Sequence, residues 1–269
     1  MINSLNFRSL IALSPLLGSA MAASSVIYDF NSSSSGDLFE GAAISGWSQS
    51  NSNPSAFGQT FPLAYVSATD FGSGSSNSAH LGTQFANTPD NSDTTLTGNL
   101  SSVNPSNTMV ASFNLAILDN AADSFEGRDG FSVALKTTAG QEAATIGFSP
   151  TAGDSESWDV SVGVNGSTST TPVQISALTG YRFGVNASHT STQFVYGAEG
   201  SSLVEFALTA SVNDLDSIGF ISFTHDPLAD VGTSANTLAF DNVMVQIPEP
   251  SSSLLMILSA GFIAVRRRR

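Results

Sequence analysis

The chain has 269 residues, of which 41% are hydrophobic and 11% are charged, and it contains no cysteine. This composition is typical of an extracellular β-protein, and it excludes disulfides and thiolate metal sites. Residues 23–246 contain three basic and 21 acidic residues, a formal charge of −18. Such a surface repels phosphate backbones, so we expect no nucleic-acid partner.

The first 22 residues predict a secretory signal peptide. Arg8 and the terminal amine form a weakly basic start, and Leu10–Leu17 is a short apolar run. Ala20-Met21-Ala22 supplies the small residues that a signal peptidase needs, so mature protein is expected to begin near Ala23. The alternative is a structural N-terminal helix, and Pro15 argues against it.

Residues 23–246 alternate apolar and polar side chains with the period of two that predicts half-buried β-strands. Turn-forming pairs such as Asn165-Gly166 and Asp226-Pro227 separate the alternating runs. The expected strands are 25–30, 61–66, 111–117, 131–136, 144–149, 158–165, 181–186, 192–197, 203–211, 217–224 and 237–246. Ten or more short antiparallel strands in about 220 residues predict one all-β domain, a β-sandwich of jelly-roll type.

The first and last expected strands contain carboxylates that need an explanation. Strict alternation turns Phe240 and Met244 to one face and Asp241 and Val243 to the other, and both faces look apolar. A buried carboxylate needs a partner, which backbone amides, an arginine or a calcium ion would supply. Because these two strands lie close together in jelly rolls, we hypothesise a structural calcium held by Asp241, with Asp29 or backbone carbonyls among its ligands.

Sugar binding commonly uses an exposed aromatic ring flanked by polar side chains. Trp47 follows Gly46 and precedes the polar run Ser48–Asn51, so it is the candidate ligand-binding ring. The alternative is that Trp47 belongs to the core, as we expect for Trp158, which alternates with valines.

No sequence motif indicates catalysis. The chain has no H-E-x-x-H pair, no G-x-S-x-G elbow, no P-loop and no dinucleotide fingerprint. His225 and Asp226 are adjacent, but adjacency along a chain is not catalytic geometry. We therefore expect no catalytic residues and no enzyme activity. The rival is a secreted glycoside hydrolase that uses carboxylates distant in sequence.

The last segment, residues 247–269, has three parts in order. Pro248-Glu249-Pro250 comes first, residues 251–265 are apolar or small, and Arg266, Arg267, Arg268 and Arg269 end the chain. At 1.5 Å per residue, a helix over 251–265 is about 22 Å long, short of a bilayer core of about 30 Å. The arginine cluster would stay on the cytoplasmic side, so transient membrane insertion leaves the body outside.

This order of parts resembles the PEP-CTERM sorting signal. The resemblance implies that an exosortase-type membrane protease recognises Pro248, Glu249 and Pro250 and removes the tail. It also implies a Gram-negative type bacterium, transient anchoring in the inner membrane, and a final place at the cell surface or outside the cell.

Three short segments of the body resemble lectin-like sandwiches. Tyr28-Asp29-Phe30 and Leu238–Val243 look like the first and last strands of carbohydrate-binding jelly rolls, and Asp129–Leu135 resembles legume-lectin and concanavalin-like domains. With the export signals, these resemblances imply a non-catalytic carbohydrate-binding or biofilm-matrix protein whose partner is extracellular polysaccharide. The remaining alternative is a purely structural matrix protein without a small ligand.

Overall fold

The sandwich domain is seen in a computed structural model. It describes residues 24–37, 39, 44–51, 64–71, 75–82, 93–100, 108–119, 128–154, 156–208, 210–226 and 236–247. The predicted signal peptide of residues 1–22 and the sorting tail from Pro248 onward lie outside these ranges. Within them, no helix is long and apolar enough to cross a membrane.

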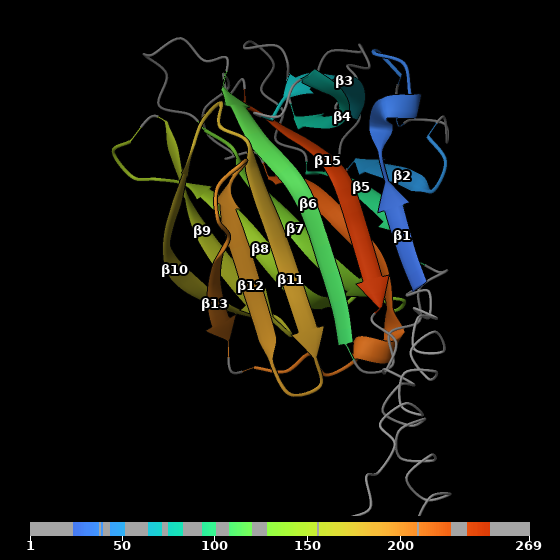
Figure 1. Cartoon of the computed structure of the whole chain (residues 1–269), viewed down its shortest axis with the longest axis vertical. Coiled ribbons are helices and arrows are strands. Elements are labelled where there is room, and N and C mark those ends of the chain that lie inside the picture. The colour runs from blue at the N-terminus through green and yellow to red at the C-terminus, as the bar shows by residue number, and fades with distance from the viewer. Residues whose placement is uncertain are drawn as a thin grey trace, which may run out of the picture.

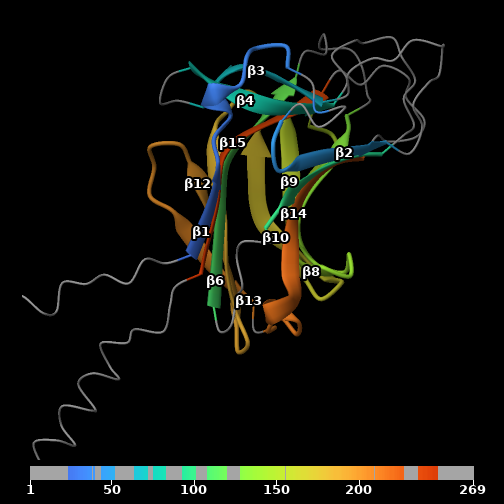
Figure 2. The ribbon, with the colours of Figure 1, turned by 90° about the vertical axis from the view of Figure 1, so that its right-hand side faces the viewer.

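The described strands form two antiparallel sheets that face each other (Figures 1 and 2). The eight-stranded sheet has the order β13-β12-β11-β6-β15-β4-β3, and β1 also pairs with β15. Its strands are β1 (Ser24–Tyr28), β3 (Ala64–Asp70), β4 (Ser75–Gly82), β6 (Thr108–Asp119), β11 (Tyr181–Ser188), β12 (Thr192–Ala198), β13 (Val204–Leu208) and β15 (Asn236–Ile247).

The seven-stranded sheet has the order β10-β9-β8-β7-β14-β5-β2. Its strands are β2 (Trp47–Asn51), β5 (Thr94–Asn99), β7 (Gly130–Thr137), β8 (Glu142–Pro150), β9 (Ser157–Val164), β10 (Ser167–Ser176) and β14 (Ile218–Asp226). Two short 3-10 helices, η3 (Phe30–Ser32) and η5 (Leu215–Ser217), complete the described elements. The expected all-β two-sheet sandwich is confirmed.

The core lies between the two sheets and is rich in phenylalanine. Phe223 of β14 stacks on Phe240 of β15 with ring centroids 3.7 Å apart, so the two rings join the sheets. Phe113 of β6 meets Phe223 edge-on at 5.4 Å. Each ring is at most 2% exposed. Burial of such rings is the main stabilising contribution of a sandwich without disulfides.

The eleven runs with apolar alternation all contain or overlap a strand. Four strands were missed: β2, β4, β5 and β10. Their sequences are dominated by Ser, Thr and Asn, as in Ser167–Thr171 of β10, and therefore look like loops. They form strands because neighbouring strands have backbone N–H and C=O groups that need hydrogen-bond partners, and because β-branched threonine fits a pleated surface.

The alternation predicted for β15 is wrong beyond Asp241. The pairing of β15 with β6 shifts register between Asp241 and Met244, and Asn242 has a positive φ of 52°. An extra residue in one strand of a pair is a β-bulge, and it reverses the facing of every later side chain. Phe240 and Val243 therefore both enter the core, whereas Met244 is half-exposed.

Candidate functional site

Asp241 lies where the neighbour of β15 changes. Along one edge, β15 pairs first with β4, up to the pair Phe240 and Ala79, and then with β1, from the pair Val243 and Tyr28. Asp241 stands between these two pairings, at the bulge, and is fully buried. Between the end of β4 pairing and the start of β1 pairing, the Asp241 side chain contacts the segment that follows β1.

The Asp241 carboxylate is held by neutral hydrogen-bond donors. Its Oδ1 accepts the backbone N–H of Phe30 at 3.5 Å, and its Oδ2 accepts the Ser76 hydroxyl at 3.2 Å and the Asn242 amide at 3.3 Å. No arginine pairs with Asp241 among the described residues. Burial raises the pKa of Asp241, and the nearby Asp29 carboxylate raises it further against the lowering effect of these donors.

Asp29 lies at the adjoining surface, as expected from the proximity of the first and last strands. It follows β1 and caps η3, because its Oδ1 accepts the backbone N–H of Asn31 at 2.8 Å. Beside it is an open hollow of about 350 Å³. Its lining residues are Ile27, Tyr28, Asp29, Phe30, Ser32, Ser33, Asp37, Ile44, Ser45 and Trp47.

Carboxylates and hydroxyls dominate the polar lining of this first hollow. Asp29 and Asp37 both border it, and Asp37 is fixed by the Ser34 N–H, which its Oδ2 accepts at 2.7 Å. Hard oxygen ligands of this kind suit calcium. However, no group of three or more His, Asp or Glu side chains gathers anywhere in the described ranges. A calcium ion here would therefore need hydroxyl, carbonyl and water oxygens besides Asp29 and Asp241.

Trp47 borders the same hollow, but it belongs to the core. Its side chain is 5% exposed. It meets the Tyr28 ring edge-on at 5.0 Å and lies 5.7 Å from both Phe30 and Phe240. The exposed ring expected at Trp47 for stacking on a sugar is therefore wrong. Among the polar neighbours that suggested exposure, Ser48 and Ser50 form the outward-facing half of strand β2.

A second hollow, of about 490 Å³, lies at the end of the sandwich where two hairpins turn. It is formed by the β7–β8 turn, the β9–β10 turn and the segment that leads into η5. Its lining residues are Thr137, Gln141, Glu142, Ala143, Asn165, Gly166, Asn213 and Asp214. We call it the amide hollow.

Asn165 fixes the shape of the amide hollow. Asn165 and Gly166 have φ values of 52° and 78°, and the sign of both matches the type I′ turn that an Asn-Gly pair favours in a hairpin. The Asn165 amide donates to the Ser211 carbonyl at 2.7 Å, and its oxygen accepts the Asn213 N–H at 3.1 Å. Asn165 thereby ties the hairpin turn to the segment before η5.

Three further side chains remain available in the amide hollow. Gln141, Asn213 and Asp214 are exposed, and their side chains have no hydrogen-bond partner among the described residues. Amides donate and accept hydrogen bonds, and a carboxylate accepts them. These groups suit a ligand rich in hydroxyls. Sequence reasoning found the Asn165-Gly166 turn but missed the site, because its groups come from segments about 70 residues apart in the chain.

His225 is buried in a pair with a carboxylate that is distant in the sequence. His225 pairs with Asp129, 96 residues away, and not with the adjacent Asp226. The His225 Nε2 lies 2.8 Å from the Asp129 carboxylate, with both side chains at most 1% exposed. The pair lies inside the sandwich, where it joins the start of β7 to the end of β14.

Comparison with known proteins supports the fold. No family model matches the chain, and the search of curated proteins finds no match. Among solved structures, the CBM2 module of the evolved Dit protein of Lactobacillus casei BL23 phage J-1 has a TM-score of 0.50 at 12% identity, over 83% of this chain and 96% of that one.

Lectin structures are similar at slightly lower scores. Basic winged bean lectin with Tn-antigen has a TM-score of 0.49 at 9% identity, covering 84% of this chain and 98% of the lectin. The carbohydrate recognition domain of Emp47p has a TM-score of 0.49 at 7% identity, covering 86% and 99%. At such identities the likeness shows the fold alone.

Proposed function

We propose that this chain is an exported, non-catalytic protein that binds a neutral extracellular polysaccharide. The amide hollow carries the proposal, because exposed Gln141, Asn213 and Asp214 converge there on a rigid support formed by Asn165. A few polar groups held in fixed positions can recognise a hydroxyl-rich ligand. The fold supports it by analogy, since the similar structures include the CBM2 module and lectins.

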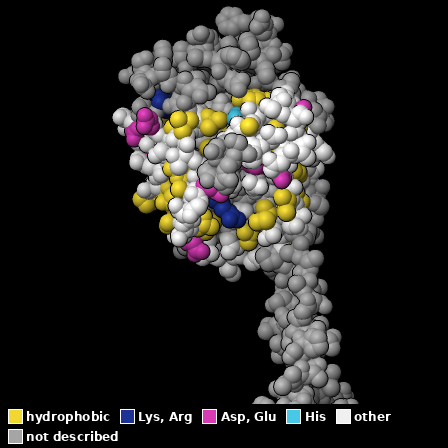
Figure 3. Space-filling view, turned by 45° about the horizontal axis from the view of Figure 1, so that its top comes forward, with side chains coloured by type: hydrophobic (Ala, Val, Ile, Leu, Met, Phe, Trp, Pro, Cys, Tyr) yellow, Lys and Arg dark blue, Asp and Glu magenta, His cyan; other side chains and the backbone are white. Residues whose placement is uncertain are grey.

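Charge indicates the kind of polysaccharide. The body has three basic residues against 21 acidic ones, and no basic residue lines the amide hollow. An anionic chain would be repelled, whereas a neutral one would not. Figure 3 shows that uncharged surface separates scattered acidic side chains on the face drawn. A neutral glycan is therefore the better match.

The test is binding to soluble neutral polysaccharides, a glucan, a mannan and a galactomannan, with anionic alginate as the comparison. Asn213→Ala and Gln141→Ala should weaken binding without changing the melting temperature, because both side chains are exposed and neither has a hydrogen-bond partner among the described residues. Asn186→Ala, an exposed amide on β11, is the matched control. Normal folding without binding to any glycan would favour the structural matrix protein.

A hydrolase remains the rival to this proposal. Release of reducing sugar from a bound polysaccharide by the purified protein would establish that activity and refute the non-catalytic function. The candidate carboxylates would then be Glu142 and Asp214, which both line the amide hollow.

We also propose that the chain follows the PEP-CTERM route. An exosortase-type protease would cut near Pro248-Glu249-Pro250 after signal peptidase has removed residues 1–22, and 251–265 would hold the chain in the membrane until then. Replacing Glu249 by Ala in a bacterium with this pathway should leave the tail attached, as intact mass and membrane fractionation would show. Normal processing of that variant would refute the assignment.

The calcium hypothesis stands as a second proposal. Two carboxylates, Asp29 and buried Asp241, lie close enough that one raises the pKa of the other, and a cation would relieve that repulsion. The test is a calcium titration followed by the melting temperature. No shift in melting temperature, together with no calcium in elemental analysis, would refute it.

A further inference from the structure

Part of the outer face of the seven-stranded sheet is free of charge, although the exposed or half-exposed residues of its strands also include Lys136, Glu142, Asp159 and Asp226. Residues such as Leu96 of β5 and Phe223 of β14 point into the core. The residues that alternate with them along each strand therefore point outward. Strand pairing aligns the outward residues into two rows that cross all seven strands. One row is Ser48, Thr97, Ser222, Ala134, Thr145, Gly163 and Thr168, and the other is Ser50, Thr95, Thr224, Ser132, Gly147, Ser161 and Thr170.

We call these two rows the hydroxyl face. Eleven of its fourteen residues are Ser or Thr, and the others are Ala or Gly. None is charged, although the body of the chain contains 21 acidic residues. The second row is exposed or half-exposed along its whole length, whereas Ser222, Ala134 and Gly163 in the first row are buried. Exposed strand residues ordinarily carry mixed charges for solubility, so the composition of the second row departs from that of an ordinary solvent-facing surface.

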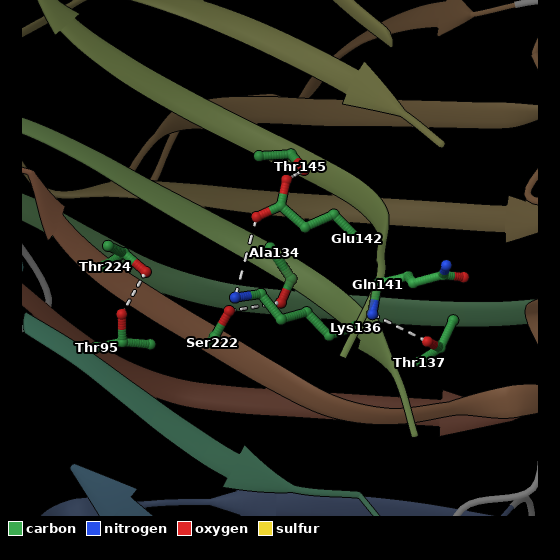
Figure 4. Close-up of polar contacts among 9 residues, drawn as sticks. All are labelled: Thr95, Ala134, Lys136, Thr137, Gln141, Glu142, Thr145, Ser222 and Thr224. Atoms are coloured by element: carbon green, nitrogen blue, oxygen red, sulfur yellow. Dashed lines mark hydrogen bonds and ion pairs between the residues drawn. The ribbon is translucent and has the colours of Figure 1, made fainter. Parts of the chain in front are cut away.

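The hydroxyl face is suited to binding an extended polymer. Ser, Thr and Ala side chains have few rotamers, so holding them against a ligand costs little entropy. The Thr95 and Thr224 hydroxyls already bond each other at 3.0 Å across β5 and β14 (Figure 4). Seven strands spaced about 4.8 Å apart give a face roughly 29 Å wide, which is long enough for several sugar units.

The hydroxyl face is continuous with the amide hollow. Thr145 of the first row donates its hydroxyl to Glu142 Oε2 at 3.3 Å, and Glu142 lines the hollow. The Lys136 ammonium lies 3.9 Å from the same carboxylate, so the one ion pair at this border is neutral overall (Figure 4). A ligand that leaves the hollow past Glu142 therefore meets the two hydroxyl rows without crossing unpaired charge.

We propose that a neutral polysaccharide lies extended along the hydroxyl face, with one part held in the amide hollow. The inference rests on the proposed function and specifies its ligand as a polymer rather than a single sugar. Charge complementarity selects this occupant: a neutral face on an acidic protein repels anionic chains through its surroundings and admits neutral ones.

The test measures binding of the full chain to three sizes of one probe: a soluble neutral glucan, its hexasaccharide and glucose. Affinity should rise with length, because added sugar units meet added hydroxyls. Thr224→Lys places a long charged side chain in the second row and should reduce affinity for the polymer about tenfold, while leaving glucose binding unchanged. Gln193→Lys, at a half-exposed position of β12 on the other sheet, is the matched control.

The outcomes separate the two proposals. Equal affinity for all three sizes, or polymer binding that Thr224→Lys leaves unchanged, overturns the extended-polymer inference and leaves saccharide binding in place. Failure of the unmodified chain to bind any neutral glycan overturns the proposed function itself. Thr224→Ser, which keeps the hydroxyl, should bind the polymer as the unmodified protein does. A melting temperature measured for each variant separates lost binding from lost folding.

Discussion

His80 should make the stability of the sandwich depend on pH. Its imidazole is 4% exposed in the β3–β4 hairpin. Hydroxyls surround it, with Tyr65 at 3.2 Å from Nδ1 and Thr69 and Ser78 at 2.6 and 3.1 Å from Nε2. Burial lowers the pKa of His80 from 6.5 to about 4, because none of these partners is an anion that would stabilise the imidazolium.

The lowered pKa of His80 sets both the sign and the size of the effect. As pH falls below 6.5, the unfolded chain takes up a proton at His80 while the folded chain does not, so the free energy of unfolding decreases. The loss levels off below about pH 4, where the folded state is also protonated. At 1.36 kcal/mol per pKa unit, the expected loss is about 3 kcal/mol. Above pH 6.5 this residue adds no pH dependence.

Urea denaturation of the unmodified protein and of His80→Gln, from about pH 7.5 to about pH 4, measures this contribution. The difference in unfolding free energy between the two proteins should change by about 3 kcal/mol over that range, since all other groups are common to both. His189→Gln, which removes an exposed histidine, is the control variant. A constant difference between His80→Gln and the unmodified protein at all pH values would refute the reasoning.

Three further predictions, which use four substitutions, test the packing and the cation site. Trp47→Ala should lower the unfolding free energy by about 3–5 kcal/mol in chemical denaturation, because it empties a core position; a change below about 1 kcal/mol would mean that the ring is exposed. Gly180→Ala should cost roughly 2 kcal/mol or more, since its Cβ would collide with the Phe71 carbonyl, whereas Gly140→Ala, with open space but a φ of 83°, should cost about 1 kcal/mol. Calcium should raise the melting temperature of the unmodified protein in calorimetry and not that of Asp241→Asn; equal shifts would exclude Asp241 as a ligand.

The strands that could be predicted are those whose side chains differ in polarity between the two faces. In β9, Trp158, Val160 and Val162 face the core, and the residues between them do not, so the period of two is visible in the sequence. In β10 the residues Ser167–Thr171 are polar on both faces. No alternation exists there for a sequence pattern to detect, and β10 is defined by its hydrogen bonds to β9.

The candidate sites divide in the same way. The proximity of Asp29 to Asp241 followed from the expected pairing of the first and last strands, and β1 does pair with β15. The burial of Trp47 did not follow, because two of the rings that cover it, Phe223 and Phe240, lie more than 170 residues away in the chain. The polar residues next to Trp47 in the sequence reflect the outward face of β2 and do not predict where the Trp47 ring points.

The all-β class, the acidic and cysteine-free composition and the turn at Asn165-Gly166 could be predicted without a structure, since they depend on composition and local conformational preference. The export and sorting signals stay predictions from the same source. The folded chain was needed to show that Asp241 lies at a bulge, that Gln141 and Asn213 share a hollow, and that serines and threonines of seven strands align into rows. These features depend on register between strands, which backbone hydrogen bonds between distant segments set and no local pattern encodes.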